Sequence, residues 1–262
     1  PGETMKKILL LLSVLLLPYL VSAQDDEIDN LPFDNEPLRE ESRSYFVLAG
    51  GLTVDWLMIK EDNLNSFFKD TPEELKLSGP LRLTGGQGVT GIPWIKNVRI
   101  GVFGYGGSLK SAVSTFKGVN PDGTYTGIDG ELQTKLTASM FGFSVHYGYV
   151  PFEHFAILGG VNAGWGDLTY EAYSAITTKE NKFENFGTNR LVKNYFFIMP
   201  NIQLEYALAN FIILRADASY NLTVGQDTDW TYNNLGKNSV NPDFNLSGLK
   251  LGFGVMVGLV NF

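Results

Sequence analysis

The stretch that decides the fold is IILRADASYNLTV, residues Ile212–Val224. One parity is apolar or aromatic, and its members are Ile212, Leu214, Ala216, Ala218, Tyr220, Leu222 and Val224. The other parity is mostly polar, and its members are Ile213, Arg215, Asp217, Ser219, Asn221 and Thr223. A period of two is that of a β-strand with one apolar face and one polar face.

The same alternation recurs in Leu249–Leu259, in Tyr45–Trp56 and in Ile198–Tyr206. It predicts eight strands, near residues 43–59, 79–92, 97–115, 131–150, 155–173, 194–208, 211–226 and 244–262. Pro200 lies inside the sixth strand and has no N–H for a ladder. We therefore expect a bulge or a strand start at this position.

The predicted connections alternate in length, which places all long ones at one end of an up-and-down meander. The long connections are Lys60–Ser78, with a helical turn in Asn65–Leu75, and then Phe116–Gly130, Ser174–Lys193 and Asp227–Asp243. The short ones are Pro93–Lys96, Pro151–His154 and Ala209–Asn210. An additional hairpin in the first or third long connection would give ten strands, and this alternative stays open.

Composition narrows the class of protein. Charged residues make up 18% of the 262 residues, below the roughly 25% of ordinary globular proteins. The net charge of −8 argues against a nucleic-acid partner, because such proteins carry basic patches. The chain has no Cys, which excludes disulfides and thiolate chemistry.

The N-terminal segment has the layout of a secretory signal peptide. Two lysines and a short apolar run follow Met5, and a small-residue site ends at Ala23. The apolar run is shorter than the about 20 residues that a membrane-spanning helix needs. We predict a signal peptide at residues 1–23, with 1–4 as a non-native extension, an acidic flexible periplasmic tail at 24–44 and an outer-membrane β-barrel at 45–262.

Aromatic residues gather near both ends of the predicted strands, as membrane interfaces favour. Those near the short connections are Trp94, Tyr147, Tyr149 and Tyr206. Those toward the long connections are Trp56, Trp165, Tyr170, Tyr195 and Tyr220. This distribution of aromatic residues predicts that the apolar parity faces lipid. A soluble ligand-carrying barrel, with the opposite polarity, is an alternative.

The signal peptide, eight amphipathic strands, alternating connections and terminal Phe262 together resemble the small outer-membrane β-barrels of the OmpA membrane-domain and OmpX type. The resemblance covers Tyr45–Phe262 and is one of architecture. It implies an all-β, transmembrane, antiparallel up-and-down barrel, and it implies that Phe262 helps the barrel-assembly machinery to recognise the chain. Phe262 departs from the apolar parity, so a bulge or an earlier strand end would be needed to restore its phase.

If the apolar parity faces lipid, the polar parity faces the lumen. The predicted lumen residues are Asp55, Arg82, Arg99, His146, Glu205, Arg215, Asp217 and Lys250. An eight-stranded interior is just wide enough for side chains to fill it, and isolated buried charges are very costly. We therefore predict a paired charge network in which Glu205 joins Arg215 and Asp217 across the turn at Ala209–Asn210.

No motif specific for catalysis or for a cofactor stands out. Ser144, His146 and Glu205 are residue types used in acyl transfer, but His146 lies near a short turn, far from the outer leaflet. The chain has two histidines and no Cys, which does not suit a zinc site. We predict no catalytic residues, no metal and no cofactor.

The sequence thus predicts a monomeric, non-enzymatic outer-membrane barrel that anchors extracellular loops for surface interaction or envelope integrity. Its partners would be outer-membrane lipid, the barrel-assembly machinery and an extracellular or periplasmic protein. The loop residues offered for contacts are Lys179, Lys182, Arg190, Asp227, Asp229, Trp230 and Tyr232. The alternatives are a narrow pore or transporter for small solutes and a lipid-modifying enzyme.

Overall fold

The computed structural model describes residues 44–60, 65, 73–178, 183–226, 230–233, 236–238 and 244–262. The predicted signal peptide and the acidic tail, apart from Ser44, lie outside the described residues. All described strands belong to one unit, Ser42–Phe262. Within the described residues, no helix is long and apolar enough to cross a membrane.

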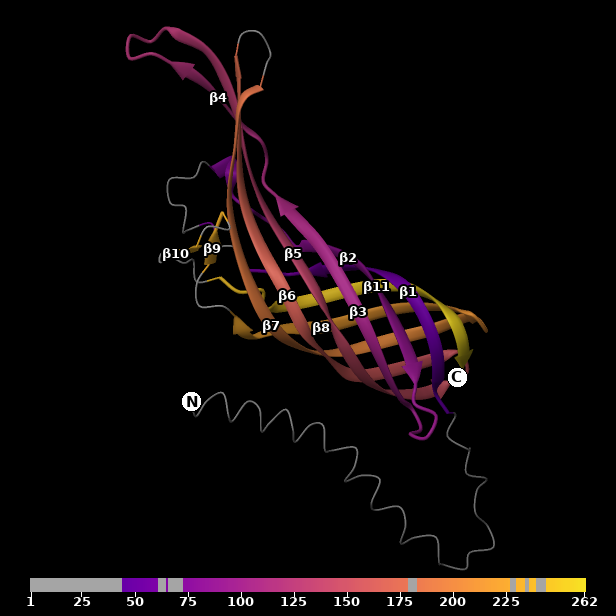
Figure 1. Cartoon of the computed structure of the whole chain (residues 1–262). Coiled ribbons are helices and arrows are strands. Elements are labelled where there is room, and N and C mark those ends of the chain that lie inside the picture. The colour runs from indigo at the N-terminus through magenta and orange to yellow at the C-terminus, as the bar shows by residue number, and fades with distance from the viewer. Residues whose placement is uncertain are drawn as a thin grey trace, which may run out of the picture. The chain divides into compact units, whose positions relative to one another are not determined.

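Eight strands close into an antiparallel ring (Figure 1). In ring order they are β1 (Phe46–Leu57), β2 (Leu81–Gly91), β3 (Val98–Lys110), β5 (Tyr125–Phe152), β6 (Phe155–Thr178), β7 (Phe183–Ala209), β8 (Ile212–Gln226) and β11 (Gly248–Asn261). The ring closes where β11 pairs with β1, from Phe46 opposite Asn261 to Leu57 opposite Lys250. The prediction of eight strands rather than ten is confirmed.

Short elements outside the ring lie among the long connections. β4 (Ser114–Val119) pairs with β5, while β9 (Trp230–Tyr232) pairs with β7 and with β10 (Gly236–Asn238). A 3-10 turn, η1 (Glu73–Leu75), falls within the predicted helical turn. All four therefore belong to the end of the barrel that carries the long connections.

The exterior of the ring is apolar and the interior holds the polar parity. On β11 the outward residues are 41% to 66% exposed, and they are Leu249, Leu251, Phe253, Val255, Val257 and Leu259. Lys250, on the opposite parity, is 1% exposed. Exposing apolar side chains around a closed ring while burying a charge inside is the polarity of a membrane barrel, because only lipid solvates such a surface favourably. It is the reverse of a soluble carrier.

Three strands continue well past the length that crosses a bilayer. β5 has 28 residues, β6 has 24 and β7 has 27, whereas about 9–11 suffice to cross. Their far ends, together with β4, form a sheet that extends beyond the ring (Figure 1). We call it the projecting sheet: β4 with residues 125–136, 170–178 and 183–192.

The prediction that Phe116–Gly130 and Ser174–Lys193 are loops is therefore wrong for most of their length. Residues 125–130, 174–178 and 183–193 are strand, paired across β5, β6 and β7. Beyond the membrane neither face of a strand must be apolar, so the pairing of the backbone persists after the hydrophobic alternation has ended.

Pro200 and Phe262 lie in positions that the sequence did not settle. Pro200 is inside β7 opposite Val161, so it is not a strand start, and the nearby register shift between β7 and β8 lies at Phe196/Phe197. β11 runs to Asn261 in unbroken register with β1. Phe262 therefore stays on the inward parity, where its ring stacks on Tyr45 with centroids 5.1 Å apart.

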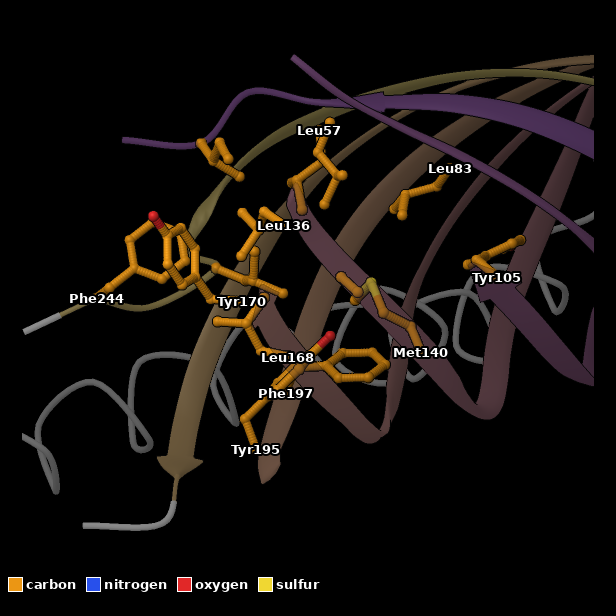
Figure 2. Close-up of a cluster of buried hydrophobic side chains, with 14 of the residues drawn as sticks. Leu57, Leu83, Tyr105, Leu136, Met140, Leu168, Tyr170, Tyr195, Phe197 and Phe244 are labelled. Carbon is orange, nitrogen blue, oxygen red and sulfur yellow. The ribbon is translucent and has the colours of Figure 1, made fainter. Parts of the chain in front are cut away.

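The upper interior, toward the long connections, is packed with apolar side chains (Figure 2). Members of this cluster lie on the inner faces of many strands, and they include Leu57, Leu83, Leu136, Met140, Leu168, Tyr170, Tyr195 and Phe197. Leu75, Leu77, Phe244 and Leu246, from the connections, are also buried. A smaller apolar cluster, around Val47, Leu158 and Met256, lies in the other part of the interior.

Candidate functional site

The first polar network in the lumen centres on Arg99 of β3. Its Nη1 lies 2.6 Å from Glu205 Oε1 on β7, and both side chains are fully buried. Tyr45 closes the group: its hydroxyl donates to Glu205 Oε2 at 2.7 Å and accepts from Arg99 Nη1 at 2.6 Å. Charge-assisted bonds of this kind are the strongest that proteins form. We call these residues, with Gln203 and His146 described next, the Arg99 network.

Gln203 and His146 extend the Arg99 network across the lumen. Arg99 donates to Gln203 Oε1. Gln203 Nε2 lies 3.1 Å from His146 Nε2, which is also 2.9 Å from Asn201 Oδ1. One ring nitrogen cannot donate to Asn201 and accept from Gln203 together, so each tautomer of neutral His146 makes one of these bonds.

The second polar network centres on Lys250 of β11. Its Nζ lies 2.5 Å from Asp55 Oδ1 and 2.8 Å from Asp217 Oδ2. Arg215 Nε is 4.0 Å from the other oxygen of Asp217, and the Thr53 hydroxyl donates to Asp55 Oδ2 at 3.0 Å. We call Asp55, Arg215, Asp217 and Lys250 the Lys250 network.

Gly252 makes the Lys250 network possible. It pairs with Asp55 on one side and with Asp217 on the other. A Cβ at position 252 would collide with the carboxylate oxygens of both residues. The absence of a side chain lets two like charges converge on one ammonium group, which neutralises part of the charge of each.

Each network is balanced in charge. The Arg99 network holds one cation and one anion, and the Lys250 network holds two of each. Because burial of an unpaired charge costs several kcal/mol, of the order of 3–5 when one partner is removed, this balance favours side chains that stay locked together. These networks and the two apolar clusters lie buried inside the ring.

Seven of the eight predicted lumen residues lie inside, and Arg82 does not. Arg82 is exposed, so its prediction is wrong: the inward parity of β2 belongs to Leu81 and Leu83, both fully buried. Glu205 also has a different partner from the one expected. It stands opposite Arg215 in the register, but its ion pair is with Arg99.

Sequence reasoning did not name several neutral residues that belong to the networks or contact them. Tyr45, Thr53, Gln203 and Asn201 are all buried on the inward parity. The parity of Asp55 and Glu205 would have selected them, since each lies an even number of residues from one of those two. What the sequence does not contain is which strand lies opposite across the lumen.

Seven of the nine aromatic residues predicted for the membrane interfaces lie on the outside of the barrel. At the short-turn end they are Trp94, Tyr147, Tyr149 and Tyr206, and toward the long connections they are Trp56, Trp165 and Tyr220. The predictions for Tyr170 and Tyr195 are wrong, because both residues face inward and are buried in the apolar cluster. Their rings serve packing rather than the lipid interface.

The residues of the long connections that were expected to make contacts differ in exposure. Trp230 is fully buried, with Lys193 Nζ 5.6 Å from its ring centroid, so its prediction as a displayed residue is wrong. Tyr232 is exposed and donates to Asn189 at 2.8 Å. Lys179, Lys182, Asp227 and Asp229 lie outside the described residues.

The outer face of the projecting sheet carries a charged row. Glu171 lies 3.6 Å from Lys135 Nζ and 3.9 Å from Arg190 Nε, and it accepts from the Tyr173 hydroxyl at 2.5 Å. Burial and the neighbouring Glu171 carboxylate raise the pKa of Tyr173 to about 12. This face is therefore polar and held in place by its own contacts.

The residues considered for acyl transfer do not form a triad. His146 Nε2 contacts Asn201 and Gln203, and its Nδ1 has no hydrogen-bond partner among the described residues. Glu205 is bonded to Arg99 and Tyr45 instead. Within the described part of the chain no group of three or more His, Asp or Glu is placed to hold a metal ion.

A closed eight-stranded ring, an outer apolar belt with aromatic residues toward both ends and charged groups paired inside the ring define the class of protein. It is a β-barrel of the bacterial outer membrane. The family to which it belongs within this class is not given by sequence: no family model matches the chain, and no curated protein matches it.

Several solved structures resemble the chain at low sequence identity. Ail, the attachment invasion locus protein of Yersinia pestis, solved with the heparin analogue sucrose octasulfate, is 12% identical, with 84% of this chain and 99% of that chain covered and a TM-score of 0.35. A major outer membrane protein from Thermus thermophilus is 10% identical, with 80% and 98% covered and a TM-score of 0.37. Acinetobacter baumannii CarO2 is 7% identical, with 81% and 99% covered and a TM-score of 0.33. Similarity this low carries no argument about function.

Proposed function

We propose that the protein is a non-enzymatic, non-conducting membrane anchor that presents the projecting sheet for surface interaction. The observation that carries this proposal is the burial of paired charges and of apolar clusters inside the ring. The Arg99 and Lys250 networks are neutral and buried, and apolar side chains pack the interior next to them. A water path through such an interior would have to break charge pairs.

The projecting sheet supports the proposal that the protein takes part in surface interaction. Three strands continue as paired backbone beyond the ring, and β4 adds a further strand whose outer edge has no partner among the described residues. Exposed, ordered strands with a free edge are a usual surface for binding another protein by strand addition. In this proposal the barrel works as a monomer surrounded by outer-membrane lipid after the barrel-assembly machinery has inserted it.

The proposal is tested in cells that lack the gene and receive either the full chain or a trimmed chain. In the trimmed chain an Asn-Gly turn replaces residues 118–128 at the tip of β4 and β5, which keeps the pair of Lys117 and Asp129. We expect both chains to show the heat-dependent shift in gel mobility of a folded barrel. Only the full chain is expected to restore surface adhesion or envelope resistance to large antibiotics. Equal restoration by the trimmed chain would contradict the proposal.

The competing function is a narrow pore. Conduction through the lumen would require the buried charge pairs to separate. A pore would restore growth on a small solute with the trimmed chain as well as with the full chain, since the lumen is the same in both. The two functions therefore give different results in the same pair of strains.

A further inference from the structure

Three aromatic side chains form one cross-strand row on the outside of the barrel. Phe141 on β5, Trp165 on β6 and Phe196 on β7 are register partners. Their ring centroids are 6.0 Å apart for Phe141 and Trp165, and 5.5 Å apart for Trp165 and Phe196. Phe141 is 57% exposed and Trp165 is 50% exposed. We call these three residues the aromatic ladder.

The aromatic ladder stops at a position that has no side chain. The register shift between β7 and β8 brings Gly225 opposite Phe196. A Cβ on Gly225 would meet only the Cβ of Phe196, at 3.9 Å, so the space beside the ladder is open. The shift therefore leaves room on the outer face at the top of the barrel wall.

A groove of about 510 Å³ occupies this space. Its apolar wall is the aromatic ladder, and its other wall holds Asp167 and Asn194, which are partners in the next outward row. The Asp167 carboxylate accepts a hydrogen bond from the Ser139 hydroxyl at 2.5 Å. The volume is within the range of about 300–1,000 Å³ that small-molecule sites have.

The lining specifies the chemistry of an occupant. Among the described residues that line the groove, Asp167 is the one with a charge, and none is Lys or Arg. A phosphate group would be repelled by the carboxylate, whereas hydroxyl groups donate to carboxylates and accept from amides such as Asn194. Aromatic faces pack well against the C–H-rich face of a sugar ring or against an acyl chain. The groove thus suits a molecule with an apolar body and a hydroxyl-rich head.

The position of the groove selects the source of that molecule. The aromatic ladder belongs to the interface aromatics toward the long connections, and the row above it, Ser139–Asp167–Asn194, begins the polar outer face. Such a boundary between an apolar belt and a polar surface is where lipid headgroups lie. We propose that this groove binds one outer-leaflet lipid with an uncharged, hydroxyl-rich headgroup, with Asp167 and Asn194 on the head and the aromatic ladder against its glycosyl and upper acyl part.

The test uses the mature full-length chain, refolded in micelles, and native mass spectrometry. The probes are a monogalactosyl diacylglycerol and a phosphatidylglycerol with the same acyl chains. Gly225→Leu fills the groove, and Asp167→Asn removes its charge. Gly159→Leu is the matched control, because Gly159 is another outward glycine with open space around it. The shift in gel mobility shows that each variant is folded.

We expect the wild type and Gly159→Leu to retain the galactolipid in preference to phosphatidylglycerol. Asp167→Asn should weaken its retention about tenfold, the size expected for losing a hydrogen bond to a charged group. Gly225→Leu should weaken its retention at least as much, because the leucine side chain occupies the groove. If Gly225→Leu does not fold, Asp167→Asn alone decides. Equal retention of both lipids, preference for phosphatidylglycerol, or equal loss in Gly159→Leu would overturn the proposal. So would displacement of the galactolipid by an equal concentration of methyl galactoside, because the site would then recognise free sugar.

Discussion

In β5, β6 and β7, the part inside the ring and the part in the projecting sheet differ in where charged residues lie, although each strand and its pairing are continuous. Within the ring, each strand alternates between lipid and lumen, and the buried charges of Arg99 and Glu205 pair across the lumen. In the projecting sheet, charges such as Lys135 and Glu171 lie half-buried on the outer face and pair with each other there. The comparison teaches that the solvent, not the strand itself, sets which positions tolerate a charge.

The largest effect is expected from leaving a buried charge without its partner. Arg99→Met leaves the fully buried Glu205 carboxylate without its cationic partner. We expect a loss of about 3–5 kcal/mol in the free energy of unfolding. Urea unfolding in detergent, followed by tryptophan fluorescence, measures it. Arg82→Met is the control, because Arg82 is exposed, and the double variant Arg99→Met/Glu205→Gln should lose less than the single one. A single variant as stable as wild type would refute the Arg99 network.

A smaller loss of stability is expected from adding a methyl group next to the Lys250 network. Gly252→Ala places a methyl group against Asp55 and Asp217, and overpacking of this kind costs about 1–3 kcal/mol. The same unfolding assay measures the loss. Gly104→Ala, where the added Cβ meets nothing within 4 Å, should be close to neutral. Equal stability of the two variants would show that the carboxylates do not converge on Lys250.

The matching substitution in the projecting sheet should be nearly silent. Glu171→Gln removes the anion between Lys135 and Arg190, at distances of 3.6 and 3.9 Å. Both ion pairs are long and lie half-buried on the outer surface, and surface pairs contribute only about 0–1 kcal/mol, so the unfolding midpoint should hardly move. A loss as large as that of Arg99→Met would abolish the distinction between the two regions.

The smallest effect is a change in titration. Burial and Glu171 raise the pKa of Tyr173 to about 12. Because a negative neighbour opposes formation of the phenolate, Glu171→Gln should lower this pKa toward the ordinary value of about 10. Carbon-13 NMR of labelled tyrosine follows the titration, with Tyr173→Phe identifying the signal. A pKa that rises or stays unchanged would mean that Glu171 does not act on Tyr173.

The sequence predicts the part of the molecule that the membrane constrains. Alternation in Ile212–Val224 and Leu249–Leu259 places the lipid face and most lumen charges, because lipid imposes a strict apolar parity. The same signal ends where the strands leave the membrane, which is why the ends of β5, β6 and β7 were expected to be loops. Partnerships across the lumen, such as Arg99 with Glu205, depend on which strands face each other after closure. Local patterns contain no information about this.

The most direct test of whether the lumen is closed to ions is single-channel recording of refolded residues 24–262 in a planar lipid bilayer. The gel mobility of the same sample shows that the barrel is folded. The account predicts folded protein without conductance, because neutral charge pairs and packed apolar side chains occupy the lumen. Steady, discrete conductance from folded barrels would contradict it.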